Sequence, residues 1–430
     1  MIKPSSAEVP LQNLVDHTTS RLVESQKAEM PAGTTKFEIT YKWGCDGSTN
    51  HSRYNQPFLG EDEHGEIKSY NDSHVLLFAL VPLCLKIAED DERSCWINTL
   101  PSSVSLCRPI LIMFAKEEAK LTQALVKKIE DQVLALKPTE CFIGGRSITV
   151  YPKLTLSMMD TKVMNDLTGT HSGACFICGR SGKRLNEALG DEYVEDNEKC
   201  SHGFSPLHCY IRIMELLLNI AFRLKMKNPK WRVGKSDVDK NDHEKFILQT
   251  LKERLGLRLN EPRPGGGNSN VGNSGRTFFV KWEEVCKITG LNPELMERLY
   301  YILLVINCKA TINQTVFAAY LEETRKLYVL LYGWYPMTPT LHKVLVHGGS
   351  IVKNSYLPVG MYSEEALESR SKSIRKFREN HARKFSREAN MNDVYKSLLF
   401  TSDPVISPQN RITSALSDYP AGALKLLSHS

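Results

Sequence analysis

Two short pairs of metal-ligating residues stand far apart in the sequence. Cys175-x-x-Cys178 and His342-x4-His347 are separated by 164 residues, with Asp160 before the first pair and Glu368 after the second. Thiolate and imidazole are the preferred ligands of structural zinc, which binds four of them in a tetrahedron. The two pairs supply such a closed set, so the spacing predicts a zinc site formed by these four residues.

Three acids could form a second metal site with oxygen ligands. Asp46 follows a predicted strand, Lys36–Cys45, whose apolar residues alternate, and Asp160 ends another, Ser147–Ser157. Glu368 lies in the first turns of a predicted late helix. Mg2+ prefers oxygen ligands, and two such ions can clamp the attacking and leaving oxygens of a phosphoryl transfer. Each acid alone fits a turn or a helix cap, so only their joint arrangement suggests catalysis.

Composition limits the class of protein. A chain of 430 residues exceeds what one hydrophobic core usually organises, so two or three subdomains are expected. No apolar run is long enough for a membrane span, and the first 30 residues lack the apolar segment of a signal peptide. Eleven irregularly spaced cysteines then indicate free thiols and metal ligands in a reducing compartment.

The pattern of elements changes near residue 180. Before it we predict strands at His74–Lys86 and Cys107–Phe114, a helix at Glu117–Leu136 and a brief strand at Ala174–Cys178. After it the sequence predicts mostly helices, at Leu207–Lys227, His243–Leu257, Trp282–Thr289, Pro293–Asn307 and Thr315–Tyr332.

The domain prediction follows from this change. Residues 36–180 form the first part of a core, 181–350 a helical zinc-binding insertion, and 351–400 the final core helix with a C-terminal helical segment. The loop Pro264–Gly275 has the composition of a flexible linker. Residues 1–35, with an amphipathic stretch at Leu11–Val23, are expected to be a leader or the remnant of a dimerisation and DNA-binding region. Residues 401–430 are expected to be a poorly ordered tail.

Basic residues are concentrated where DNA could bind. The net charge of +6 is modest, but residues 370–387 hold eight basic residues and one acid. The positive charges of such a helix repel one another, and binding to polyanionic DNA relieves this repulsion and releases counterions from the DNA. Lys372, Arg375 and Lys376 lie about one and two helical turns beyond Glu368, so we predict that they contact the DNA backbone.

The order of strands, helix, acid-bearing strand, helical insertion and acid-bearing helix predicts an α/β, ribonuclease H-like catalytic core interrupted by a large helical insertion. The chain also resembles Transib transposases and the catalytic subunit of the V(D)J recombinase over about Phe37 to Leu399. The motifs that carry this resemblance, in order, are Cys45-Asp46-Gly47, Pro82–Lys86, Cys175-x-x-Cys178, Leu207-His208-Cys209, Leu341–His347 and Glu364-x3-Glu368-x3-Lys372-x3-Lys376-Phe-Arg378.

The resemblance implies a DDE-type cut-and-paste DNA transposase. Asp46, Asp160 and Glu368 would be the acidic triad for two Mg2+ or Mn2+ ions, and the Cys and His pairs would bind structural Zn2+. His208 would lie near the active site with a catalytic role, where a cation could stabilise the scissile phosphate or a leaving oxygen. Independently of the resemblance, the position of Arg276 directly after the glycine-rich loop predicts a contact with DNA phosphate. The expected reactions are nicking at terminal inverted repeats, hairpin formation on flanking DNA and strand transfer into target DNA. We expect a homodimer in the nucleus, with the need for an accessory subunit open.

Alternatives remain at two levels. Asp166 competes with Asp160 as the second acid, although Asp160 directly ends a strand. A catalytically inactive, domesticated zinc-containing DNA-binding protein would keep the zinc site and basic surfaces without cleavage. A hydrolase based on His347-Gly-Gly-Ser350 is disfavoured, because the sequence has no Gly-x-Ser-x-Gly elbow for a nucleophile.

Overall fold

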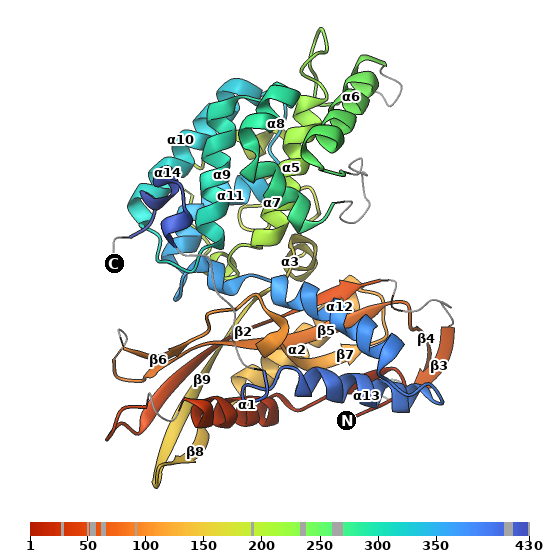
Figure 1. Ribbon diagram of the computed structural model, residues 1–430, viewed down its shortest axis with the longest axis vertical. Coiled ribbons are helices and arrows are strands. Elements are labelled where there is room, and N and C mark those ends of the chain that lie inside the picture. The colour runs from red at the N-terminus through yellow and green to blue at the C-terminus, as the bar shows by residue number, and fades with distance from the viewer. Residues whose placement is uncertain are drawn as a thin grey trace. The chain divides into compact units, whose positions relative to one another are not determined.

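The chain leaves its first unit after Leu167 and returns to it at Tyr362. In the computed structural model, unit 1 comprises Met1–Leu167 and Tyr362–Ser414, and unit 2 comprises Thr168–Met361 and Ala415–Ser430 (Figure 1). The structure describes residues 1–26, 30–49, 51, 57–61, 66–90, 93–190, 193–232, 238–259, 270–407 and 416–428. The helical unit thus begins earlier than the predicted boundary at residue 181.

A seven-stranded mixed sheet organises unit 1. Its order is β1-β7-β5-β2-β9-β8, with β6 also paired to β5. Strand β5 pairs antiparallel with both β2 and β7, whereas β9 runs parallel to β2. The bounds are β1 Ser6–Glu8, β2 Lys36–Ser48, β5 Val75–Ile87, β6 Ser94–Ile97, β7 Arg108–Met113, β8 Thr139–Ile143 and β9 Arg146–Met158. The predicted strands that begin at His74, Cys107 and Ser147 are therefore confirmed. A separate two-stranded sheet pairs β3, Pro57–Glu61, with β4, Ile67–Asn71.

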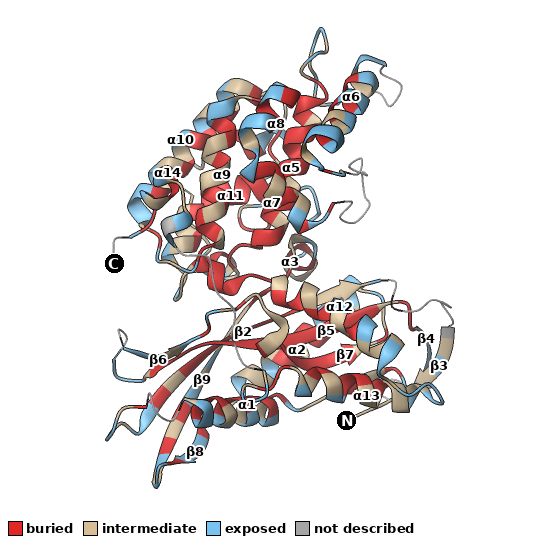
Figure 2. Ribbon diagram, in the orientation of Figure 1, coloured by how far each residue is buried: buried red, intermediate tan, exposed pale blue. Residues whose placement is uncertain are grey.

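The central strands are buried because their sequence is apolar on both faces. Every residue of β5 except Ile87 is buried, as expected for a strand covered on both sides (Figure 2). Helix α12, Glu365–Asn380, packs on β2 and β5, and helix α13, Arg387–Phe400, packs on β7 and β1. Helix α2, Ala119–Leu134, confirms the predicted helix and lies in the crossover that parallel pairing of β2 and β9 requires.

The two chain ends differ from their prediction. Strand β1 pairs with β7, and helix α1, Leu11–Ser25, packs on β8 with its apolar face buried, so residues 1–35 contribute to unit 1. Asp403 is buried and accepts a 2.8 Å hydrogen bond from Arg21. Helix α14, Ala421–Leu424, packs on α9, Pro293–Asn307, of unit 2. The described parts of the expected tail are thus packed against the two units.

Unit 2 is helical, as predicted. Besides α14, its described helices are α4 Asn197–Ser201, α5 Pro206–Ala221, α6 Val238–Leu255, α7 Gly272–Val280, α8 Trp282–Thr289, α9 Pro293–Asn307, α10 Gln314–Tyr332 and α11 Pro339–Lys353. The expected strand Ala174–Cys178 is wrong, because only one bridge, Ala174 to Ser181, flanks a turn there. Residues 272–275 of the predicted linker begin α7, and residues 264–269 lie outside the described residues.

Among the described helices of both units, none combines the length and the apolar character that a bilayer span requires.

Candidate active site and metal centre

Asp46 and Asp160 stand at the same end of two paired parallel strands. In the register of β2 and β9, Gly44 is opposite Met158, so each acid follows its paired position by two residues. A Cβ atom on Gly44 would lie 2.1 Å from the carbonyl oxygen of Met158, so only glycine permits this close approach. Both acids are half-buried, and Asp160 also accepts a 2.8 Å hydrogen bond from the backbone amide of Val163.

Glu117 is a further acid at this site, and it was not predicted. Its Oε2 atom accepts a 3.0 Å hydrogen bond from the amide of Gly47, the residue after Asp46, and its other oxygen accepts from Lys162. The side chain is only 12% exposed. The available signal was an acid shortly after a predicted strand. It was obscured because Glu117-Glu118 also matches the acidic first turn of a helix.

Three carboxylates place negative charge around the thiol of Cys45. Burial raises the pKa of this thiol well above its usual value, and the negative charges of Glu117, Asp46 and Asp160 raise it further. A group of carboxylates around a buried strand end offers the oxygen donors that Mg2+ or Mn2+ prefers. The donor types suit divalent cations of this class, but among the described residues only Cys175, Cys178, His342 and His347 lie close enough together to hold a metal ion.

Two contacts align α12, which carries Glu368, with β2, which carries Asp46. The Lys42 ammonium donates a 2.6 Å hydrogen bond to the carbonyl of Ser363, and Arg378 donates a 3.0 Å hydrogen bond to the carbonyl of His51. Asp46 lies between Lys42 and His51 in the chain, and the half-buried Glu368 lies between Ser363 and Arg378. The helix therefore runs alongside the strand in the same direction, past the end that bears the acids.

The basic run on α12 divides into two faces. Arg370 is 1% exposed and donates to the carbonyls of Cys107 and Val104, and Arg378 pairs with the buried Asp72 at 2.6 Å. These arginines stabilise unit 1. The three predicted DNA contacts, Lys372, Arg375 and Lys376, are exposed instead.

The exposed face also has acidic partners. Lys372 lies 3.3 Å from Glu368, and Arg375 lies 3.1 Å from Glu379. Exposed pairs of this kind contribute little to stability, so these cations can exchange partners for phosphate at small cost. Two of the eight basic residues in this run, Arg370 and Arg378, are therefore structural.

The predicted zinc ligands come together within unit 2. One ligand atom from each of Cys175, Cys178, His342 and His347 lies within 4.8 Å of all the others. Cys178 Sγ is 3.3 Å from His342 Nε2. Nε2 of His347 is buried and has no hydrogen-bond partner among the described residues, as expected for an atom that faces a metal position. Two thiols and two imidazoles in a closed, buried cluster fit Zn2+.

Contacts outside the cluster orient both imidazoles. His342 Nδ1 is 2.7 Å from the carbonyl of Leu185, and His347 Nδ1 is 2.7 Å from Glu195 Oε1. Glu195 is held in turn by Ser350 at 2.9 Å. Because Nδ1 of each ring is engaged, Nε2 is left for a metal, which is the usual arrangement around metal-bound histidine.

His208 and Arg276 lie on neighbouring helices of unit 2. His208, in the first turn of α5, has Nδ1 2.8 Å from Ser205 Oγ. Arg276, inside α7, places its guanidinium 5.5 Å from the ring centre of Tyr210. The acids belong to unit 1, so the predicted catalytic role of His208 and the predicted DNA contact of Arg276 stay predictions.

The mixed α/β architecture of unit 1 is that of an RNase H-like domain. Residues 39–174 match the family model of the recombination-activation protein 1 (RAG1) RNase H domain. The matched stretch contains Asp46, Glu117 and Asp160 and ends one residue before Cys175. The chain is therefore similar to the catalytic region of RAG1- and Transib-type recombinases over this stretch. No curated protein matches the chain.

Proposed function

We propose that the protein is a DDE-type DNA transposase or recombinase that cuts and joins DNA at terminal inverted repeats. The observation that carries this proposal is the parallel register of β2 and β9, which brings Asp46 and Asp160 to the same end of neighbouring strands. The match to the RAG1 RNase H domain supports it. The alignment of α12 with β2 supports Glu368 as the third acid.

The chemistry proposed is phosphoryl transfer in two stages. Water first cleaves a phosphodiester at the repeat end and frees a 3′-hydroxyl on the flanking DNA. That hydroxyl then attacks a phosphodiester of the opposite strand, which closes a hairpin on the flanking DNA and releases the 3′-hydroxyl of the element end. Divalent cations held by Asp46, Asp160 and Glu368, with Glu117 beside them, would lower the pKa of the attacking hydroxyl and offset negative charge on the phosphate. The carboxylates would bind and orient the cations, and the proton of the attacking hydroxyl would pass to solvent.

The remaining groups have supporting roles in this proposal. Lys372, Arg375 and Lys376 would contact the DNA backbone through the exposed face of α12. Structural zinc at Cys175, Cys178, His342 and His347 would stabilise unit 2 without taking part in the chemistry. Two repeat ends must be cut together, so we propose a homodimer acting in the nucleus, and light scattering of the purified protein tests the dimer.

The test is cleavage of a duplex that carries the inverted repeat flanking the gene, with Mn2+ and a denaturing gel. Nicked and hairpin products are expected from the wild type. Asp46→Ala should abolish both products while zinc content and circular dichroism stay unchanged. Asp160→Asn should do the same, whereas Asp166→Asn, the matched control for the competing acid, should retain both.

Two outcomes would contradict the proposal. Cleavage by Asp46→Ala would show that the acid assignment is wrong. DNA binding by the wild type without cleavage of any repeat duplex in Mn2+ would favour the inactive DNA-binding protein instead.

A further inference from the structure

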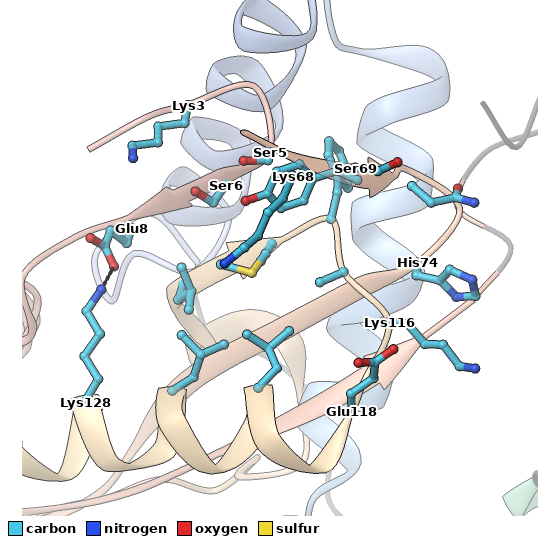
Figure 3. A pocket seen from close by; sticks show the side chains of 18 of the residues that line it. Lys3, Ser5, Ser6, Glu8, Lys68, Ser69, His74, Lys116, Glu118 and Lys128 are labelled. Carbon is cyan, nitrogen blue, oxygen red and sulfur yellow. Dashed lines mark hydrogen bonds and ion pairs between the residues drawn. The ribbon is translucent and has the colours of Figure 1, made fainter. Parts of the chain in front are cut away.

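A pocket of about 610 Å3 lies in unit 1 between β1, β4, the end of β7 and the first turns of α2 (Figure 3). Its size falls in the range of roughly 300–1,000 Å3 that is typical of small-molecule sites. The floor is apolar and is formed by Leu111, Met113, Phe114, Leu121 and Leu125. The acids of the candidate active site are not among the residues that line this pocket.

The rim of the pocket is positive and rich in donors. Lys3, Lys68, Lys116 and Lys128 line it, together with the hydroxyls of Ser5, Ser6 and Ser69. In Figure 3 the side chain of Lys68 extends across the middle of the pocket. The lining acids are Glu8 and Glu118, and Glu8 is already paired with Lys128 at 3.0 Å. A ligand that fits both surfaces carries an anionic group on an apolar or aromatic body.

The partners of the central lysine can be exchanged. Lys68 lies 3.6 Å from Glu66, and both side chains are more than half exposed. Such a pair contributes little in water, so a phosphate in the pocket can compete for the ammonium. Tyr70, which also lines the pocket, already stacks on Phe58 with ring centres 5.7 Å apart, so its other face is the one that a flat base can use.

The pocket adjoins the acid cluster through three consecutive residues. Lys116 and Glu118 line the pocket, while Glu117 between them hydrogen-bonds to the amide of Gly47 beside Asp46. We propose that the pocket binds a nucleoside 5′-phosphate unit, either free or unstacked from a DNA strand that the acids act on. The choice of a nucleotide over another aromatic phosphate ester rests on the proposed function.

The probe is 2′-deoxyadenosine 5′-monophosphate, added to the full chain without divalent metal. Binding is followed by calorimetry and by the methyl NMR signal of Met113, assigned with a Met113→Leu variant. The nucleotide should shift that signal, and Lys68→Ala combined with Lys116→Ala should weaken binding by about tenfold or more. Lys120→Ala combined with Lys153→Ala, two exposed lysines of the same unit outside the pocket, should leave binding unchanged.

Ligand analogues separate the two halves of the pocket. Deoxyadenosine and inorganic phosphate, tested alone, should each bind at least about tenfold more weakly than the nucleotide. If about 5 mM nucleotide does not shift the Met113 signal, any binding is too weak to be specific, and the proposal is overturned. Equal binding by the lysine variant, or tighter binding of a glutamate-rich peptide, would overturn it as well.

Competition identifies the source of the nucleotide. If a duplex with one bulged nucleotide displaces the probe and a fully paired duplex does not, the site binds an unstacked nucleotide of DNA. If neither duplex displaces the probe, the site binds free nucleotide. Either of these two results supports a site for a phosphate ester. Because binding is measured without metal, its failure is distinct from a failure of Mn2+-dependent cleavage, which tests the proposed function.

Discussion

Lys42 Nζ donates a 2.6 Å hydrogen bond to the backbone carbonyl of Ser363, a residue 321 positions later in the chain. Lys42 is fully buried on β2, four residues before Asp46, and Ser363 is five residues before Glu368. One ammonium thus joins the strand of the first acid to the helix of the third. The contact makes Lys42 a candidate positioning residue for the acid set.

Replacing Lys42 should change how stability depends on pH. Burial lowers the pKa of Lys42 to about 7, from 10.5 in the unfolded chain, although Cys107, Glu364 and Glu365 oppose the shift. Between these pH values the unfolded state holds a proton that the folded state has released, so this group's contribution to the free energy of unfolding rises with pH. Lys42→Met lacks that contribution. From pH 7 to pH 10, urea unfolding should therefore show the wild type gaining a few kcal/mol relative to the variant, since one pKa unit corresponds to about 1.4 kcal/mol.

Mn2+ binding separates a positioning role of Lys42 from general stability. Lys42→Met should weaken Mn2+ binding at the acids by about tenfold, measured by electron paramagnetic resonance. Lys86→Met is the matched control, because Lys86 is a buried lysine that pairs with Glu38 at 3.5 Å near the other end of the sheet. Equal Mn2+ affinity in the two variants would rule out a positioning role for Lys42.

Glu117→Gln should also weaken Mn2+ binding, by about tenfold. The amide keeps the shape and an acceptor for the Gly47 amide but removes the negative charge that attracts a cation. Glu118→Gln is the control, because it removes an exposed neighbouring charge. If Glu117→Gln binds Mn2+ like the wild type, Glu117 serves only to hold the strand end.

Glu195→Gln should loosen zinc without removing a zinc ligand. Its Oε1 atom holds His347 Nδ1 at 2.7 Å, and loss of such an outer partner typically costs about 10–100-fold in metal affinity. Competition with a coloured chelator measures the affinity, with Glu198→Gln as an exposed control. A wild-type chain that carries no zinc would refute the four-ligand assignment itself, whereas unchanged affinity in Glu195→Gln would refute only the orienting role.

The two faces of α12 should respond differently to substitution. Arg370→Leu leaves buried acceptors at Cys107 and Val104 unsatisfied, so it should lower the free energy of unfolding by about 1–3 kcal/mol for each one. Lys372→Ala with Lys376→Ala should leave stability unchanged and weaken DNA binding. The slope of log affinity against log salt should fall by roughly 0.9 for each phosphate that the variant no longer neutralises. An unchanged slope would show that this face does not bind DNA.

Local patterns were enough to predict most elements of this chain. Continuous apolar runs located β5 and β7, and helical spacing located α8 and α9, because those segments are buried on the faces that the patterns imply. The Cys and His pairs were recognisable because zinc restricts its ligands to a few residue types. Because structural zinc needs four such ligands, the two pairs were expected to meet at one site.

The remainder depends on tertiary contacts that no local pattern encodes. Glu117 and Glu118 look alike in sequence, yet only Glu117 reaches the Gly47 amide. Arg370 and Lys372 belong to one basic run, and packing alone decides that Arg370 is buried while Lys372 is exposed. The N-terminal segment was expected to be a leader because a short strand such as β1 becomes recognisable only through its partner β7.

The return of the chain to unit 1 at Tyr362 sets an order on its assembly during synthesis. Unit 2 is almost continuous in sequence, so most of it is made before the last segment of unit 1 emerges from the ribosome. The pairing of Arg21 with Asp403 closes a loop of 382 positions, and contacts of such long range form late and slowly. A nascent chain therefore carries Asp46, Glu117 and Asp160 well before it carries Glu368, and it stays without the full acid set until unit 2 has been synthesised as far as Met361.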